Sequence, residues 1–473
     1  MPRRVAAKPI FSPAGLLPAL RAFPDARRCW LAYSGGMDSR VLLHALVALG
    51  AQRRSELRAI HVDHGLQSRS ADWAEHCRAQ CDALGVPLEL RRLTPGRARG
   101  ESREAAARQA RYAALRDAVG AGDILLTAQH LDDQAETLLL ALLRGSGVKG
   151  LAAMPALTPF GPAWLLRPLL DYPRSALLAY AREQGLDWVE DPSNADLSYD
   201  RNFLRARVLP LLAERWPACA ASLARSASHC AEAQHLVEQA AEEELARLRG
   251  TRTGSLSACA LAACEPLLGK AVLRHWIARL GLPPPGMRQL ERIRHELLGA
   301  RADRSPLVAW PGCEVRRYRD DLFAMPPLPA HPGPLEIPWG SGVLELPEEL
   351  GRLVLTDSRG RALDPASLCS QGLRVRFAVP GLSCRPAAGA RRRQLKQLYQ
   401  EAGVPPWLRP YVPCLFLETE LLAVGDLWCC GRGTNHAAAR LRVRWDGGIR
   451  THPAFPSRPA GAGDPDNAVR MPS

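Results

Sequence analysis

The feature that most constrains the fold is the loop at residues 34–39, which reads SGGMDS. It follows a short apolar run and precedes an amphipathic segment, so it is expected to join a buried strand to a helix. Two adjacent glycines let the backbone approach an anion and adopt conformations that other residues avoid. Amides at the start of the helix would then point at phosphate oxygens. The loop therefore predicts a strand–helix unit that binds phosphate.

The side chains of this loop indicate the kind of phosphate ligand. Hydroxyl groups can donate to phosphate oxygens, whereas Asp38 would be repelled by bare phosphate, so its carboxylate indicates a bridging magnesium ion. The loop lacks the GxxxxGK[ST] string of Walker-type loops. A capped helix after a tight turn is the structural alternative. The predicted nucleotide-binding residues are Ser34, Gly35, Gly36, Met37, Asp38 and Ser39.

Apolar runs and amphipathic segments alternate from residue 28 to about residue 170. The runs are 29–33, 57–62, 86–93, 123–128 and 164–170, and the helical segments are 39–49, 71–84, 102–119 and 132–143. Strands that alternate with helices at this spacing predict an α/β fold with a doubly wound parallel sheet. Two further helices, at 173–185 and 201–212, are expected to complete this unit.

The rest of the chain divides by composition. We expect the sheet domain at 1–216, a mainly helical middle domain at 217–325, and a proline-rich linker with short strands at 326–360. A small α+β domain at 361–447 and a disordered tail at 448–473, rich in Pro, Gly and Ala, would follow.

The charge balance favours a polyanionic partner. There are 62 basic and 48 acidic residues, a net charge of +14, and only four of the basic residues are lysine. Part of the arginine excess can reflect genomic base composition, but a basic chain remains typical of nucleic-acid binding. The 13 cysteines show no CxxC spacing, which favours free thiols. No apolar run is long enough for a membrane span and no signal peptide is predicted, so we expect a cytoplasmic protein.

A second group of polar residues lies in the string TAQHLDDQAETLLLALLRGSGVKG at 127–150. His130 follows the end of a predicted strand, beside the crevice where doubly wound sheets bind ligands. Asp133 and Glu136 are three apart and share a helix face. One imidazole and two carboxylates could hold magnesium and transfer protons. Asp-x-x-Glu at a helix start is equally typical of a capping box.

Several basic residues are candidates for binding phosphate or RNA, with a solvated surface as the alternative. Residues 371–410 contain eight basic residues and one acidic residue, a local charge of +7. In that stretch the run at 391–393 begins a predicted helix with an apolar face. The candidates are Arg108, Arg111, Arg201, Arg205, Arg391, Arg392, Arg393 and Lys396.

Taken together, these strings resemble one family. SGGMDS, HVDHGL, HLDDQAETLLLALLRGSG, EDPSN and RNFLR occur in this order in tRNA(Ile)-lysidine synthetases of the PP-loop ATP-pyrophosphatase superfamily, and residues 391–407 resemble their C-terminal tRNA-binding domain. Two positions differ. The family often has paired histidines where this chain has Gln129-His130, and its G-x-x-[hydrophobic]-R-P pattern reads GLSCRP at 381–386.

The resemblance implies a two-step ligase reaction. ATP would adenylate the wobble cytidine of a CAU-anticodon tRNA(Ile) at the C2 oxygen, and the ε-amine of free lysine would then displace AMP from C2. Codon reading would change from AUG to AUA. The resemblance implies ATP and Mg²⁺ as cofactors, Asp38 at magnesium, His130 with Asp133 in activation, and Glu136 at lysine or magnesium.

The residues leave three other functions as alternatives. A 2-thiolation enzyme would generally need a sulfur-carrying or cluster cysteine, and an amidotransferase-type synthetase would need a glutaminase or an N-terminal Cys. A catalytically inactive tRNA-binding protein would not need the acidic residues named above. The oligomeric state is left open, with a homodimer as one option.

Overall fold

The computed structural model describes residues 10–23, 26–63, 70–93, 103–301, 304–330, 332–347, 349–357, 360–365, 373–386, 390–430, 442–452 and 454–456. The chain divides into two compact units, Met1–Leu236 and Val237–Ser473, and each is described by itself. Within the described ranges, no helix is both long enough and apolar enough to cross a bilayer.

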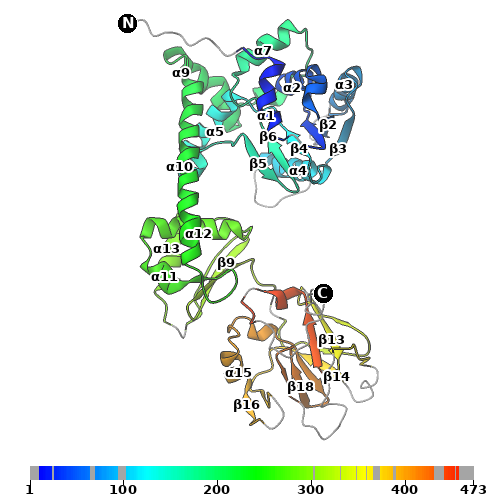
Figure 1. Cartoon of the computed structure of the whole chain (residues 1–473), viewed down its shortest axis with the longest axis vertical. Coiled ribbons are helices and arrows are strands. Elements are labelled where there is room, and N and C mark those ends of the chain that lie inside the picture. The colour runs from blue at the N-terminus through cyan, green and yellow to red at the C-terminus, as the bar shows by residue number, and fades with distance from the viewer. Residues whose placement is uncertain are drawn as a thin grey trace, which may run out of the picture. The chain divides into compact units, whose positions relative to one another are not determined.

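A six-stranded sheet forms the centre of the first unit (Figure 1). Its strands are β1 (Arg28–Ala32), β2 (Glu56–Asp63), β3 (Leu88–Arg92), β4 (Ile124–Leu126), β5 (Leu157–Phe160) and β6 (Ala163–Leu166). They lie in the order β3-β2-β1-β4-β6-β5, and all neighbours are parallel except β5, which pairs antiparallel with β6. The predicted doubly wound parallel sheet is confirmed. The edge strand β5 was not predicted, because LTPF is short and carries a proline.

The predicted helices of this unit are present with shifts of a few residues. They are α2 (Met37–Ala48), α3 (Ser70–Ala83), α4 (Arg103–Ala118), α5 (Leu131–Leu143) and α7 (Arg174–Glu183). Residues 200–215 form α8 (Asp200–Phe203), a π-helical turn η4 (Leu204–Val208) and α9 (Leu209–Arg215). Two short helices, α1 (Leu17–Arg21) and α6 (Val148–Leu151), were not predicted.

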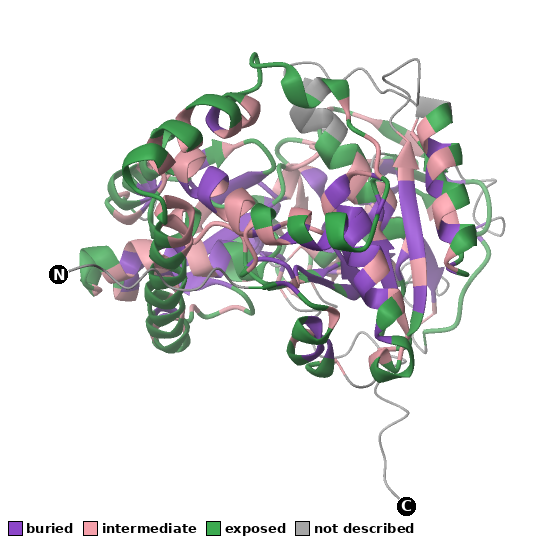
Figure 2. Cartoon of the chain, turned by 90° about the horizontal axis from the view of Figure 1, so that it is seen from above, coloured by how far each residue is buried: buried purple, intermediate pink, exposed green. Residues whose placement is uncertain are grey.

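The core of this unit lies between the sheet and its helices. Helix α2 contributes Val41, Leu42, Leu43 and Leu46, all without exposed surface, and they pack with Leu31 of β1. Figure 2 shows the strands in the colour of buried residues and the outer sides of the helices as exposed. Burial of β1 and α2 fixes the loop between them at the edge of the sheet.

The second unit contains the middle and C-terminal domains, and α10 (Cys219–Arg247) runs from the first unit into it. The helices α11 (Ala258–Ala263), α12 (Pro266–Arg279) and α13 (Met287–Arg292) and the π-helical η5 (Ile293–Leu298) form the middle domain. The same domain contains a four-stranded sheet, and its helices and strands share one hydrophobic core. The strands are β7 (Leu256–Ser257), β8 (Leu307–Trp310), β9 (Cys313–Tyr318) and β10 (Asp321–Met325), in the order β7-β10-β9-β8.

Among the described residues, the C-terminal domain is built mainly from antiparallel strands, with a few short helices. Its strands are β11 (Glu336–Pro338), β12 (Leu344–Glu345), β13 (Arg352–Thr356), β14 (Leu373–Arg376), β15 (Ser383–Cys384), β16 (Arg393–Gln394), β17 (Cys414–Leu417), β18 (Glu420–Val424), β19 (Trp428–Cys429) and β20 (Arg442–Asp446). Helix α15 (Leu395–Glu401) buries Leu395, Leu398 and Tyr399, which confirms the predicted apolar face. The predicted helix start at 391–393 is wrong, because Arg393 lies in the strand β16 and the helix begins only at Leu395.

Folded structure continues past residue 447. Residues 448–451 form the short helix η8 (Gly448–Thr451), and Ala454 and Phe455 are buried, with Phe455 edge-on to Trp445 at 5.4 Å between ring centroids. These apolar residues order the first part of the tail that composition alone marked as disordered. Residues 457–473 lie outside the described residues.

Candidate active site

Two loops bearing the predicted residues leave neighbouring strands of the first unit. The SGGMDS loop follows β1, and residues 127–130 follow β4, which pairs in parallel with β1. After β1 the chain forms β2 and β3 on one side of that strand, and it then crosses to form β4 on the other side. This is the topological switch point, where the carboxyl ends of strands in an open α/β sheet leave a crevice for ligands.

The SGGMDS loop opens directly into α2. The first helical hydrogen bond runs from Arg40 N to Gly36 O at 2.9 Å, so the amides of Met37, Asp38 and Ser39 have no acceptor within the helix. Ser39 Oγ donates to Gly36 O at 2.9 Å and lies 3.1 Å from Ser34 Oγ. The two hydroxyls thus hold the loop closed while the first-turn amides remain available to an anion.

Gly35 cannot be replaced without distortion. Its φ of +79° lies in the left-handed region, and a Cβ at this position would lie 2.8 Å from Cys77 Sγ of α3. Its carbonyl oxygen accepts a hydrogen bond from Val189 N at 3.0 Å. The loop is therefore fixed on one side by a buried thiol and on the other by the segment after α7.

His130 lies at the centre of a group of carboxylates. Its Nε2 is 3.7 Å from Asp38 Oδ2 and 3.5 Å from Asp133 Oδ2, and its Nδ1 is 3.6 Å from Asp132 Oδ2. Burial by itself lowers the pKa of His130, but the facing carboxylates of Asp132, Asp38 and Asp133 outweigh it and raise the pKa to about 10. At neutral pH the imidazole is thus a cation that holds the phosphate-loop and α5 carboxylates together.

The helix start settles which residue caps α5. His130 precedes the first helical residue, Leu131, and its amide donates to Asp133 Oδ2 at 3.0 Å. Asp133 therefore does act as a capping residue. Glu136 lies one turn further on, has no exposed surface and makes no capping bond, so the Asp-x-x-Glu capping interpretation does not apply to it.

Two arginines close over Glu136. Arg201 Nε donates to Glu136 Oε2 at 2.7 Å, and Arg205 Nε donates to Glu136 Oε1 at 2.6 Å. Arg205 Nη2 also donates to Asp133 Oδ1 at 2.9 Å. Bonds of this kind between ionised groups are among the stronger ones in proteins. The sequence predicted that Arg201 and Arg205 bind phosphate or RNA. In the structure both guanidinium groups pair with acidic side chains of the site.

The two arginines of α4 differ in their surroundings. Arg108 is exposed and stacks over the ring of Tyr112 at 5.1 Å. Burial, together with the positive charges of Arg108 and Arg201, lowers the pKa of Arg111. Among the described residues no carboxylate pairs with Arg111, and a cation beside other cations is typical of a phosphate-binding position.

The charges of the site leave room for a further cation. Four carboxylates (Asp38, Asp132, Asp133 and Glu136) face three cations (His130, Arg201 and Arg205). The buried Asp38 Oδ1 accepts no hydrogen bond from the described residues. Mg²⁺ is usually held by one or two carboxylates together with substrate phosphates, so this oxygen fits such an ion. No group of three or more protein ligands for a metal occurs in the part of the chain that is described.

Sequence reasoning missed several residues of the site. Asp132 faces His130 Nδ1 and also accepts from Arg174 N at 2.7 Å, which links the imidazole to the start of α7. The doubled aspartate of the motif was the available signal. Gln129, in place of the family's first histidine, accepts a hydrogen bond from the Thr127 hydroxyl. Nothing in the sequence pointed to Cys77.

The basic candidates of the C-terminal domain lie around α15. Arg391, Arg392 and Lys396 are exposed, and Arg392 Nε donates to Ser383 Oγ at 2.8 Å. Arg393 instead donates from Nη1 to Glu401 Oε2 at 2.8 Å. Three of the four candidates therefore present charge to solvent, whereas the charge of Arg393 is already neutralised.

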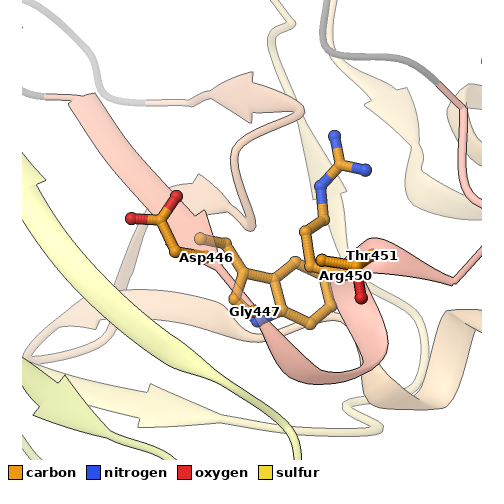
Figure 3. A pocket seen from close by; sticks show the side chains of 5 residues that line it. Asp446, Gly447, Arg450 and Thr451 are labelled. Carbon is orange, nitrogen blue, oxygen red and sulfur yellow. The ribbon is translucent and has the colours of Figure 1, made fainter. Parts of the chain in front are cut away.

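The same domain contains a cavity of about 270 Å³ lined by Trp445, Asp446, Gly447, Arg450 and Thr451 (Figure 3). Arg450 is buried and donates from Nε to both carboxylate oxygens of Asp426 at 2.9 and 3.0 Å, and from Nη1 to Pro456 O at 3.1 Å. These bonds attach the segment after β20 to the domain. Arg450 is therefore a structural residue of this domain.

The fold and the phosphate loop define a PP-loop domain, and a family model described as the PP-loop domain matches residues 15–212. Models for the TilS substrate binding domain and the TilS substrate C-terminal domain match residues 256–323 and 373–445.

Full-length relatives agree with these domain matches. The tRNA(Ile)-lysidine synthase of Methylococcus capsulatus is 45% identical over 397 residues, 84% of this chain and 90% of that protein. The proteins of that name from Alkalilimnicola ehrlichii and Coxiella burnetii are 43% and 40% identical, over 92% and 89% of this chain and 98% and 93% of theirs. The chain belongs to the tRNA(Ile)-lysidine synthase family.

Proposed function

We propose that this chain joins free lysine to the wobble cytidine of a CAU-anticodon tRNA(Ile) in an ATP-dependent ligase reaction. The observation that carries the proposal is the meeting, at one switch point, of a phosphate loop with the acidic cluster of Asp133 and Glu136. Family membership supports the same reaction and does not favour 2-thiolation or an inactive tRNA-binding protein. Reaction in the cytoplasm would give access to ATP, lysine and tRNA.

In the first step the C2 oxygen of the cytidine attacks the α-phosphorus of ATP, and pyrophosphate leaves. The free amides of Met37, Asp38 and Ser39 would bind the departing phosphates, in the way that helix starts bind anions. Asp38 would hold a magnesium ion, which supplies positive charge to the phosphates when bound. The His130 imidazolium keeps the Asp38 and Asp133 carboxylates in place and can donate toward a phosphate oxygen.

The cation Arg111 is suited to the adenylate. It is half-buried, lies near Arg108 and Arg201, and has no carboxylate partner among the described residues. A phosphate group would relieve the repulsion among these cations. We therefore assign Arg111, with Arg108 beside it, to the α-phosphate or to a phosphate of the tRNA.

In the second step the lysine ε-nitrogen attacks C2, and the bond from C2 to the oxygen of AMP breaks. Asp133 and Glu136 would accept hydrogen bonds from the incoming ammonium group, and a carboxylate oxygen can take the proton that the nitrogen loses. Arg201 and Arg205 fix the direction of both carboxylates before lysine arrives. A fixed acceptor loses less entropy on binding than a mobile one.

The proposal is tested with purified protein, ATP, labelled lysine and a tRNA(Ile) transcript with a CAU anticodon. We expect lysine to enter the tRNA with release of AMP and pyrophosphate. The matched control is the same transcript with the wobble cytidine changed to uridine, which offers no substrate. Equal labelling of both transcripts, or AMP release without lysine incorporation, would contradict the proposed reaction. The molar mass of the same preparation in light scattering would separate a monomer from a homodimer.

A further inference from the structure

Exposed aromatic side chains gather on one short stretch of the first unit. Among the described residues, the exposed Phe, Tyr and Trp side chains are those of Trp164, Tyr199, Phe203 and Trp216. Three of these four lie between positions 199 and 216, along α8, η4 and α9. Aromatic residues normally bury most of their surface, so such a concentration at the surface is typical of a binding site.

The two faces of this stretch have different tasks. Arg201 and Arg205 point inward, since both donate to the buried Glu136. Phe203 N donates to Tyr199 O at 3.0 Å, so these two residues are one helical turn apart and share a face. Phe203 is 48% exposed and Tyr199 is 39% exposed. The stretch from Tyr199 to Arg205 thus contacts the acidic cluster on its inner side and exposes aromatic rings to solvent on its outer side.

The charge of the stretch favours a polyanion. Residues 199–216 contain four arginines and two acidic residues, and two of these arginines already pair with Glu136. Arg207 and Arg215 are exposed, and no carboxylate of the described residues pairs with either. Aromatic rings interleaved with unpaired arginines are the combination with which proteins bind single-stranded nucleic acid.

We propose that Tyr199, Phe203 and Trp216, together called the aromatic segment, bind the unpaired bases of the anticodon loop by stacking, while the exposed Arg207 binds a phosphate of the same loop. This inference rests on the proposed function. Glu136 has no exposed surface, so a cytidine that reacts beside it must leave its place in the loop. Bases that stay behind lose a stacking partner, and an aromatic side chain can replace it. Stacking needs unpaired bases, so the segment should distinguish a loop from a duplex.

The test measures binding of the full chain to an anticodon stem-loop and to a fully paired RNA of the same length. Phe203→Ala should weaken stem-loop binding about tenfold, because stacking contributes roughly 1–3 kcal/mol per base. Its salt dependence should not change, since no charge is lost, and duplex binding should not change either. Phe203→Trp, which keeps an aromatic ring at this position, should bind the stem-loop about as tightly as the wild type. Arg207→Ala should lower the salt slope by about one. The matched control is Trp164→Ala, which removes an exposed aromatic ring elsewhere in the same unit.

The outcomes separate this inference from the proposed function. If the wild type forms lysidine and Phe203→Ala binds the stem-loop as tightly as wild type, the inference alone is wrong. If the wild type forms none while stem-loop binding depends on Phe203, the proposed reaction is wrong and the inference stands. If Phe203→Ala lowers the affinity for the stem-loop and for the duplex equally, the stacking assignment is wrong. If it lowers the molar mass from dimer to monomer and leaves RNA affinity unchanged, the assignment is also wrong, and the segment contacts a second copy of the chain.

Discussion

Arg205 donates from Nε to Oε1 of Glu136 over 2.6 Å, although 69 positions separate the two residues. Arg201 occupies the other oxygen at 2.7 Å, and Glu136 has no exposed surface. The carboxylate assigned to lysine is therefore held before any substrate binds. Preorganisation of this kind places the acceptor within narrow limits and shields it from water.

Glu136→Gln keeps the shape of the side chain and removes its charge. We expect the KM for lysine to rise about 10- to 100-fold, because a hydrogen bond to a charged group contributes roughly 1.5–3 kcal/mol. ATP–pyrophosphate exchange should stay near wild type. Lysidine formation across a range of lysine concentrations measures the effect. The control is Glu296→Gln, an exposed carboxylate paired with Arg292 at 2.7 Å. A lowered melting temperature with an unchanged KM would leave Glu136 a purely structural residue.

Asp38→Asn should abolish ATP–pyrophosphate exchange and leave the fold intact. The amide keeps the size and shape of the carboxyl group, but it lacks the negative charge that a magnesium ion requires. Exchange measured against magnesium concentration, with circular dichroism on the same preparation, checks both parts. Asp82→Asn serves as the control, since Asp82 is an exposed carboxylate of α3. Exchange near wild type in Asp38→Asn would remove the assigned metal role.

The exposed cations of the C-terminal domain should bind tRNA through its phosphates. Changing Arg391, Arg392 and Lys396 to Ala should weaken tRNA binding and reduce the slope of log affinity against log salt by about three. ATP binding without tRNA should not change.

The matched control for this patch removes the same charge from arginines that are already paired. Arg58, Arg78 and Arg91 pair with Glu56, Glu75 and Glu89 at 2.5 to 2.8 Å. Their triple change to Ala should leave the salt slope close to wild type. Arg393→Ala should also have a small effect, because Glu401 already neutralises that guanidinium. Equal slopes for all of these variants would identify the patch as ordinary surface.

His452 should make the stability of the C-terminal domain depend on pH. Burial, and secondly the charge of Arg316, lowers the pKa of His452 to about 4. The unfolded chain then binds a proton between about pH 6.5 and pH 4 that the folded domain does not. Stability is full above pH 6.5 and falls as pH decreases through this window, by about 3 kcal/mol in total.

Comparison of wild type with His452→Gln isolates this contribution. Gln can still accept the hydrogen bond that Ala454 N donates to His452 Nδ1 at 3.0 Å, but it does not titrate. The difference in unfolding free energy between the two proteins should therefore vary with pH between 4 and 6.5 and be constant above. A constant difference across the whole range would show that the imidazole protonates equally in both states.

The sequence was sufficient for the elements whose signals are local. The apolar runs before Ser34 and before His130 located β1 and β4, and the glycines and polar residues after them located both loops of the site. A parallel sheet follows from strand–helix alternation, and adjacent strands then bring the two loops together. Periodicity is a weaker guide for edge strands such as β5, which are short and partly exposed.

The contacts of the site could not be predicted, because they join distant positions. Nothing within RNFLR shows that Arg201 and Arg205 turn toward Glu136, and a solvated pair would have the same spacing. The π-helical turn at Leu204–Val208 changes which residues share a face and has no simple sequence signature. The thiol of Cys77 against Gly35 depends on how α3 packs on the sheet.

The hydrogen bond from Val189 N to Gly35 O has a consequence for how small a working fragment can be. A chain cut after residue 170 would retain all six strands and both sequence motifs, yet its phosphate loop would lose this support. It would also lack Arg201 and Arg205, so Glu136 would be a buried anion without a counterion. The shortest fragment with an intact site must therefore extend through η4, well beyond the last strand of the sheet. Competence for catalysis is completed only when that late helix has been synthesised and has docked.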